Sequence, residues 1–206
     1  MSSATSIKII NEFAKARDLA FLFEGTVWSY EGASGSSASS GGMLSIRFVG
    51  EKNKKEDPFC DGVLAGKLRL SPINRLWQRL RDEFIPEHGL LDVYASGRPF
   101  GDRVDVHHGS SESTEQFTAI ICANLEWKDS WSGEMLFYDE SHECVAVRHR
   151  PGRLILFGSN IKYVAHPPSQ ECPDLLKTIV FKTMERVRRP LSGEGKRATP
   201  LSVATV

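Results

Sequence analysis

The stretch Val106-His107-His108-Gly109 ends a run in which apolar and polar residues alternate, and the same pattern recurs through the second half of the chain. Short runs of this kind follow one another, separated by turn-forming pairs such as Ser96-Gly97, Pro151-Gly152 and Gly158-Ser159. The alternation predicts strands over residues 90–95, 103–107, 117–124, 133–138, 144–147, 153–157, 161–165 and 178–183. Such a series of short strands is typical of a β-sandwich or of a jelly roll with two sheets.

The first half of the chain predicts helices that support these strands. Apolar residues of Ile7–Leu22 recur at roughly helical spacing, which predicts a first helix. Ser71-Pro72 opens a stronger one, because serine can cap a helix, proline fits its first turn, and an apolar stripe follows as far as Pro86. With strands over residues 27–30 and 43–49, we expect an α+β fold that is mainly β.

We expect one domain over residues 1–185. Residues 32–42 are almost entirely Gly, Ser and Ala, which cannot form a packed core and predict a flexible loop. Because this loop lies between two expected strands, it is a connection inside the domain and not a domain boundary. Residues 186–206 combine proline, glycine and charged residues and predict a disordered tail.

Composition limits the classes of function. The chain has 206 residues, with 26 basic and 26 acidic side chains, so its charge gives no support for binding nucleic acid or an acidic membrane surface. The apolar runs are too short to cross a bilayer, and no signal peptide is visible. The four cysteines have no CxxC spacing, which fits a reducing compartment. We expect a soluble cytoplasmic protein.

The paired histidines have the residue type and the place that a mononuclear iron site requires. Such a site uses two imidazoles and one carboxylate on one side of the metal. Alternate residues of a strand point the same way, so a His-x-Asp pair places two ligands on one face, and a histidine of a partner strand completes the set. Here the residue two positions after His107 is Gly109, which has no side chain.

In the order and spacing of its motifs, the chain resembles the iron(II)/2-oxoglutarate-dependent oxygenases, in particular the small prolyl 4-hydroxylase-like branch. The likeness runs from about Trp28 to Lys182. It rests on the segments Val93-Tyr94-Ala95-Ser96-Gly97, Asn124-Leu125-Glu126-Trp127, Trp131-Ser132-Gly133-Glu134, 151–157 and 172–182. The resemblance implies a double-stranded β-helix, a cupin-like jelly roll with supporting N-terminal helices. It also implies an enzyme that uses Fe(II), 2-oxoglutarate and O2 on a small-molecule substrate.

The resemblance also implies the metal ligands. His107 falls on the first histidine of the family's His-x-Asp motif, and Gly109 falls on its aspartate. In the halogenases of this superfamily glycine or alanine replaces that aspartate, and chloride can occupy the opened position. The best positional match for the second histidine is Tyr163, while His166 follows three residues later. Strand alternation favours Tyr163 at the metal, whereas a turn at Pro167-Pro168 would redirect His166 there, and both alternatives stay open.

The anchor for 2-oxoglutarate is altered as well. The family places an arginine near the start of the last strand, where a guanidinium can pair with a carboxylate through two parallel hydrogen bonds. Here that region reads Leu175-Leu176-Lys177-Thr178. We expect Lys177 to supply a point charge and Tyr94 or Thr178 to add a hydrogen bond. The alternative is that Lys177 lies at the sheet edge and extends into water.

Other readings of the same residues remain. Asp105, Glu112 or a water molecule could complete a metal shell, and His108 as the ligand would place Ser110 at the carboxylate position. Without the resemblance, a His-His pair at a strand end is more often a polar surface feature. Trp127 and Trp131 are either the mouth of a substrate site or packing residues. The cluster Arg148-His149-Arg150 and the neighbouring Arg153 suit either an anionic substrate or a solvated turn.

Two functions from different classes follow. The first is oxidation of a small molecule by iron and 2-oxoglutarate, with halogenation as the sharper form because of Gly109 and hydroxylation as the other. The second is an oxygenase fold without iron that binds a ligand or a partner, or uses His107, His108 and Tyr163 in acid–base chemistry, because fold does not fix function. A binding module that uses the Gly/Ser loop and Trp28 is a third, weaker reading. The sequence does not indicate the oligomeric state.

Overall fold

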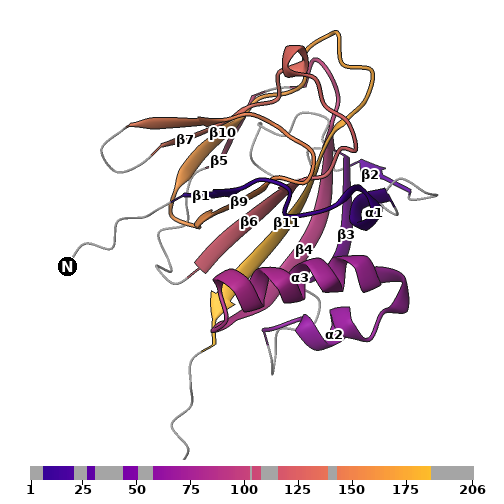
Figure 1. Cartoon of the computed structure of the whole chain (residues 1–206), viewed down its shortest axis with the longest axis vertical. Coiled ribbons are helices and arrows are strands. Elements are labelled where there is room, and N and C mark those ends of the chain that lie inside the picture. Colours follow the sequence, from indigo (N-terminus) through magenta and orange to yellow (C-terminus); the bar gives the residue numbers. More distant parts are fainter. Residues whose placement is uncertain are drawn as a thin grey trace, which may run out of the picture.

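Two antiparallel sheets form the body of the molecule, and one long helix lies against the outside of the larger sheet (Figure 1). The computed structural model describes residues 7–20, 27–30, 44–50, 58–102, 104–107, 116–138 and 143–186. The helices are α1 (Ala16–Leu19), α2 (Asp61–Ala65) and α3 (Ser71–Phe84), with short 3-10 turns at Leu68–Leu70 and Asp129–Trp131. The strands are β1 (Lys8–Ile10), β2 (Ser29–Tyr30), β3 (Leu44–Gly50), β4 (His88–Arg98), β5 (Asp105–His107), β6 (Gln116–Cys122), β7 (Met135–Tyr138), β8 (Cys144–Val147), β9 (Leu154–Gly158), β10 (Lys162–Ala165) and β11 (Leu176–Glu185).

The strand order identifies the jelly roll that the sequence predicts. The larger sheet has the order β1-β9-β6-β11-β4-β3-β2, and the smaller sheet has the order β5-β10-β7-β8. From β4 onward the chain passes back and forth between the sheets, so that β5, β7, β8 and β10 belong to the smaller sheet and the strands between them to the larger. This alternation is the winding of a double-stranded β-helix, and it brings the inner faces of the two sheets together.

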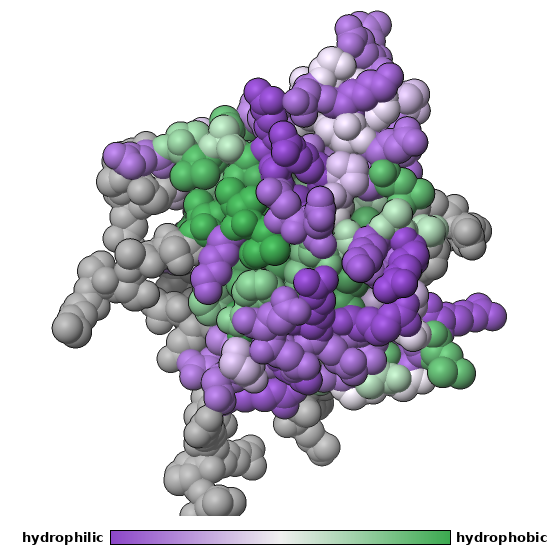
Figure 2. Space-filling model, viewed as in Figure 1, coloured by the Kyte–Doolittle hydropathy of each residue, from purple (hydrophilic) through white to green (hydrophobic). Residues whose placement is uncertain are grey.

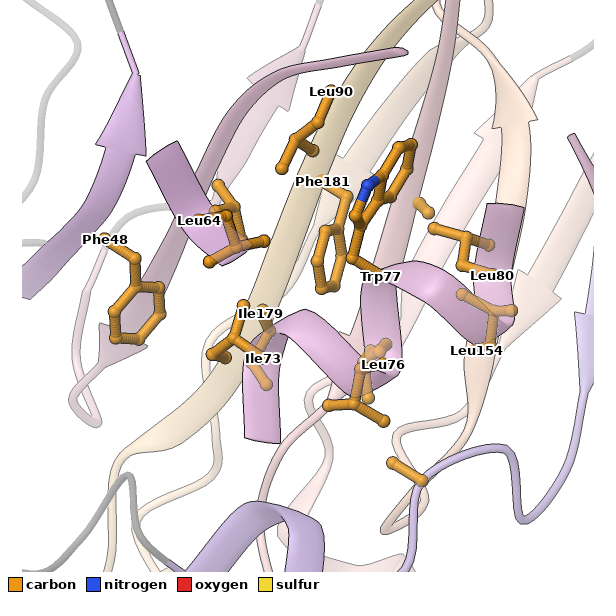
Figure 3. Close-up of a cluster of buried hydrophobic side chains, with 14 of the residues drawn as sticks. Phe48, Leu64, Ile73, Leu76, Trp77, Leu80, Leu90, Leu154, Ile179 and Phe181 are labelled. Atoms are coloured by element: carbon orange, nitrogen blue, oxygen red, sulfur yellow. The ribbon is translucent and has the colours of Figure 1, made fainter. Parts of the chain in front are cut away.

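The helix α3 covers the outer face of the larger sheet with the apolar stripe that the sequence predicts. Ile73, Leu76, Trp77 and Leu80 are all buried, and Figure 3 shows them pointing at β11 and its neighbours. Trp77 stacks on Phe181, with ring centroids 6.2 Å apart. Full burial of each such side chain contributes about 1.5–3 kcal/mol. The helix therefore fixes β11, the central strand of the sheet.

Side chains on the two faces of β11 pack into two different hydrophobic clusters. Ile179 and Phe181 belong to the outer cluster under α3, whereas Val180 belongs to an inner cluster with Phe137 and Phe157 between the sheets. Since side chains alternate along a strand, Leu176 and Thr178 share the inner face with Val180. The inner cluster fills space between the sheets, and some of its residues line a small cavity there.

The expected first helix is wrong in its first part. Lys8–Ile10 is an edge strand that pairs with Leu154–Leu156 of β9, and within the described residues 7–20 the α-helix covers Ala16–Leu19. The β-branched side chains of Ile9 and Ile10 suit a strand, and pairing with β9 outweighs their helical spacing. Figure 2 shows apolar residues gathered near β1, and Ile9 is 42% exposed there.

The turn expected at Ser96-Gly97 is also wrong, because β4 continues through it to Arg98. Gly97 pairs with Leu44 on one side and Lys177 on the other. A Cβ atom at this position would lie 3.2 Å from Leu175 and from Trp28, so glycine here permits a close approach of neighbouring side chains.

Some expectations lie outside the described residues. These are the Gly/Ser loop at residues 32–42, the strand residue Arg103, and the tail beyond Arg186. Within the described residues, no helix has the length and apolar character that crossing a membrane requires.

Candidate functional site

A small cavity lies between the inner faces of the two sheets, and part of the inner cluster lines it. Its volume is about 50 Å³. Tyr94, Ser96 and Arg98 of β4 line one side, and residues of β5, β6, β7, β10 and β11 line most of the rest. The full lining is Tyr94, Ser96, Arg98, His107, Ile120, Gly133, Met135, Tyr163, Ala165, His166, Leu176, Thr178 and Val180. The cavity thus gathers most of the residues that the sequence singles out.

His107 and Tyr163 face each other across β5 and β10. The two residues are direct partners in the strand ladder, and their rings stack with centroids 4.3 Å apart and planes 13° apart. Phe137 and Phe157 flank the Tyr163 ring at 5.4 and 5.3 Å between centroids. The position opposite His107 is therefore filled by a phenol held in an aromatic cluster.

His166 reaches the same cavity from just beyond the end of β10. The strand ends at Ala165, so the alternation that would turn the next side chain outward no longer applies. The backbone N–H of His166 donates to the carbonyl of Glu134 at 3.0 Å, and the following segment is tied down by a bridge between Pro168 and Ser132. Both residues that compete for the second ligand position, Tyr163 and His166, thus line the cavity.

Among the described residues that line the cavity, the possible metal donors include two imidazoles and no carboxylate. Among the described residues, no three His, Cys, Asp or Glu side chains come together. Gly109, His108, Ser110 and Glu112 lie outside the described residues, as does the side chain of Asp105. Within the described part of the chain, His107 and His166 are the two imidazoles that line the cavity.

Arg98, Ser96 and Thr178 form a polar end of this mostly apolar cavity. The Ser96 and Thr178 hydroxyls are buried and hydrogen-bonded to each other at 2.8 Å. Arg98 is 6% exposed, and its Nη1 donates to the carbonyl of Ala165 at 3.0 Å. Arg98 is not predicted as a site residue, because the Ser96-Gly97 pair predicts a turn where β4 in fact continues. The alternation of positions 94, 96 and 98 along one strand is the signal that could have identified it.

Lys177 does not reach the cavity, and the prediction that it anchors a ligand there is wrong. It lies between the inward residues Leu176 and Thr178, so it points to the opposite face of β11. Its Nζ forms an ion pair with Asp174 at 2.7 Å. Tyr94 and Thr178 do line the cavity, and their contact with a ligand stays a prediction.

The histidine of the Arg148-His149-Arg150 cluster is a packing residue outside the cavity. His149 is 1% exposed and lies against Trp127, with ring centroids 4.4 Å apart. Burial, with the nearby charge of Arg153, lowers the pKa of His149 to about 3. Trp127 also contacts Trp131 edge-on at 5.5 Å, which supports the packing reading of both tryptophans. This histidine therefore stays neutral at ordinary pH.

The neighbouring arginines are held by protein partners. Arg148 pairs with Asp129 at 3.2 Å on the surface. Arg153 donates from Nε to Asn11 at 2.8 Å and from Nη1 to the carbonyl of Arg148 at 2.6 Å. These bonds connect the turn before β9 to the N-terminal segment, which is a structural role.

Comparison with known proteins identifies the fold. No protein-family model matches the sequence, and no curated protein matches it significantly. Among solved structures, a prolyl 4-hydroxylase from Pseudomonas putida is similar over 89% of this chain and 95% of that one, with a TM-score of 0.57 and 15% identity. HygX from Streptomyces hygroscopicus, solved with nickel and 2-oxoglutarate bound, is similar over 89% and 84%, with a TM-score of 0.61 and 12% identity. The α-ketoglutarate-dependent epimerase SnoN from nogalamycin biosynthesis is similar over 88% and 79%, with a TM-score of 0.57 and 13% identity. The chain therefore has the double-stranded β-helix fold of the 2-oxoglutarate oxygenases, as its sequence predicts.

Proposed function

We propose that this protein is an enzyme of the 2-oxoglutarate oxygenase type, which uses Fe(II), 2-oxoglutarate and O2 to oxidise a C–H bond of a small molecule. The observation that carries the proposal is that one cavity brings together two imidazoles, His107 and His166, and a buried polar end with Arg98. The fold supports the same kind of reaction, because its structural neighbours include 2-oxoglutarate-dependent enzymes.

His107 and His166 are the residues that would hold the metal. Bound iron(II) would activate O2, which is the oxidant, with 2-oxoglutarate as the co-reductant. Two imidazoles leave more coordination positions open than a facial triad does. With Gly109 in the carboxylate position, chloride can fill one of them, so halogenation is the finer form of this proposal. Hydroxylation is the alternative, with a water molecule, Asp105 or Glu112 completing the metal shell.

The chain's own residues would position and shield the reacting molecules. Ile120, Met135 and Val180 give the cavity an apolar lining that excludes water from a bound substrate. The Tyr163 phenol lies beside His107 and would face a ligand next to the metal position.

The test is an anaerobic titration with Fe(II) and 2-oxoglutarate, followed by the weak visible charge-transfer band, with and without chloride. We expect the wild type to form the band, His166→Ala and His107→Ala to lose it, and chloride to shift it. Cys144→Ser is the matched control, because Cys144 is an exposed thiol on β8 that can bind metal adventitiously. A band that persists in both histidine variants, or one that disappears in the cysteine variant, contradicts the proposed ligand set.

A second candidate function is a ligand-binding protein that has the oxygenase fold and no iron. The observation that favours it is the stacked pair of His107 and Tyr163. This pair supplies one imidazole and a phenol, so the ladder itself offers a single histidine as a metal donor. In that case no band forms, iron does not bind, and the cavity still binds a small organic ligand. The same titration separates the two functions.

A further inference from the structure

A second and much larger pocket lies on the outer face of the larger sheet. Its volume is about 330 Å³, against about 50 Å³ for the cavity between the sheets, and it falls in the range of roughly 300–1,000 Å³ that small-molecule sites occupy. Its floor consists of side chains of β1, β9, β6, β11 and β4, which are neighbours in the sheet in that order. Its wall is the end of α3 and the turn after it, and Figure 1 shows this end of the helix beside the end of β11.

The strand register places this floor on the face that α3 covers. Lys8 is the ladder partner of Leu156, and Leu156 belongs to the outer cluster under α3. Phe117 packs against the same cluster and is the ladder partner of Thr183. Glu185, two residues further along β11, points the same way as Thr183. Since ladder partners project to the same face, the thickness of the sheet separates this pocket from the cavity between the sheets.

The middle of the pocket is apolar and is held in place without a ligand. Ile85 is 4% exposed and Leu156 is 3% exposed, and Phe84 and Phe117 add aromatic rings. The turn after α3 is fixed by a hydrogen bond from the His88 N–H to the Ile85 carbonyl at 3.0 Å. The His88 ring packs edge-on against Phe117, with ring centroids 5.1 Å apart. An apolar group that enters the pocket therefore does not have to order its wall.

The two ends of the pocket carry opposite charges. Lys8 lies on the edge strand β1, whereas Glu185 lies on β11, with Glu87 of the turn as a second carboxylate in the lining. Three strand spacings of about 4.8 Å place β11 about 14 Å from β1. Within the described part of the chain, the Lys8 ammonium and the Glu185 carboxylate have no ion pair or hydrogen bond. The charges of the pocket are thus complementary to a molecule with an ammonium at one end, a carboxylate at the other and an apolar body between them.

We propose that this outer pocket binds a short apolar peptide with free ends, two or three residues long. Its carboxylate pairs with Lys8, and its ammonium pairs with Glu185 beside Glu87. Its side chains pack on Phe84 and Phe117. An extended chain spans at most about 3.3–3.6 Å per residue, so two residues reach about 7 Å, and the two charged side chains of the pocket cover the rest of the distance. The site does not depend on iron, because it lies on the other face of the sheet from the two imidazoles.

The test measures calorimetric binding of leucyl-phenylalanine to the full chain. Two blocked forms accompany it: the N-acetyl peptide, which lacks the ammonium, and the C-terminal amide, which lacks the carboxylate. We expect Lys8→Gln and Glu185→Gln each to weaken binding of the free peptide about 3- to 10-fold, between the usual effects of an exposed ion pair and of a charged hydrogen bond. Lys8→Gln should leave the affinity for the amide within about twofold, and Glu185→Gln should do the same for the N-acetyl peptide, because each blocked form already lacks the partner of that residue.

Lys182→Gln is the matched control, because Lys182 is an exposed lysine of β11 that does not line the pocket. We expect it to bind the free peptide within about twofold of the wild type. Free phenylalanine is the length control, and it should bind at least about tenfold more weakly, because one residue does not reach both charges. Circular dichroism establishes that each variant is folded. The blocked peptides test the same two charges in the wild type, so an unfolded variant does not remove the test.

Three outcomes overturn the inference. The first is a wild type that does not bind the free peptide at about 10 mM. The second is a pair of blocked peptides, or free phenylalanine, that bind as tightly as the free peptide. The third is a folded Lys8 or Glu185 variant that loses the same factor of affinity for all three peptides. Failure of the proposed function is a separate result, because peptide binding is measured without iron and the charge-transfer band is measured without peptide.

Discussion

Replacing His149 by glutamine should make the stability of this fold less sensitive to acid. Asn124 fixes the tautomer of the histidine: its Oδ1 accepts the backbone N–H of Lys177 at 2.8 Å, and its Nδ2 donates to the Leu175 carbonyl at 2.8 Å. The His149 Nε2, 3.0 Å from the same Oδ1, must therefore be the donor. Its Nδ1 is buried and has no hydrogen-bond partner among the described residues. A second proton would enter an apolar site without an acceptor.

The magnitude follows from the difference in pKa between the folded and unfolded states. Burial lowers the pKa of His149 from 6.5 to about 3 in the folded protein. Below pH 6.5 residue 149 is therefore protonated in the unfolded chain and stays neutral in the folded chain. As a result, the free energy of unfolding decreases as the pH falls from 6.5 toward 3. At about 1.36 kcal/mol per pH unit, the loss is roughly 2 kcal/mol at pH 5. Above pH 6.5 this group has no effect on the pH dependence.

The assay is urea unfolding of the wild type and His149→Gln at pH 7.5 and pH 5.0. Glutamine keeps an N–H donor for Asn124 and cannot titrate. We expect the wild type to lose about 2 kcal/mol more than the variant between these two pH values, because only its residue 149 gains a proton on unfolding. Equal losses in the two proteins, within about 0.5 kcal/mol, would refute the claim that His149 is held neutral by burial.

Three further predictions concern stability. Trp77→Ala should lower the free energy of unfolding by about 3–5 kcal/mol, because it empties the contact between α3 and Phe181; a change below about 1 kcal/mol in urea unfolding would contradict this packing. Ser96→Ala should lower the free energy of unfolding by about 1–3 kcal/mol, because the buried Thr178 hydroxyl loses this partner. The double variant Ser96→Ala/Thr178→Val should lower it by less than the sum of the two single changes, and additive effects would argue against the bond. Gly152→Ala should lower the free energy of unfolding by about 1–3 kcal/mol, because φ is 72° at this residue and an added Cβ would collide with the Ala14 carbonyl. An unchanged melting temperature would contradict this close approach of Gly152 to Ala14.

The predictable parts of the fold are those in which a local pattern decides the structure. The stripe from Ile73 to Leu80 matches one helix face, and the alternating runs after Gly89 match strands that are buried on one side. The segment Lys8–Ile10 is different, because its spacing suits a helix and only the free edge of β9 makes it a strand. That edge is created by residues about 145 positions away in sequence, as in the pair Ile9–Ile155, so no local window contains it.

The candidate site could be predicted in its location and not in its chemistry. The resemblance places His107, Tyr163 and the start of β11 in one region, and all of them line or adjoin the cavity. Which face a side chain occupies depends on strand bounds to within one residue, because a shift of one residue reverses every side chain. For this reason Lys177 is predicted on the wrong face, and Arg98 is hidden by a turn that does not exist.

Two departures from the family pattern lie opposite residues that line the cavity: Tyr163 faces His107, and Leu176 faces Arg98. Because ladder partners project to the same face, a group lost from one strand can be supplied by its partner without moving the backbone. Arg98 places a positive charge beside Leu176 in this way. The ladder partners of Tyr163 are His107 and Phe137, so the ladder offers no second imidazole, and under the proposed function that group would come from His166 beyond the strand end. The effect of His166→Ala on iron binding therefore separates an oxygenase from a binding protein, whereas carboxylate binding is compatible with both.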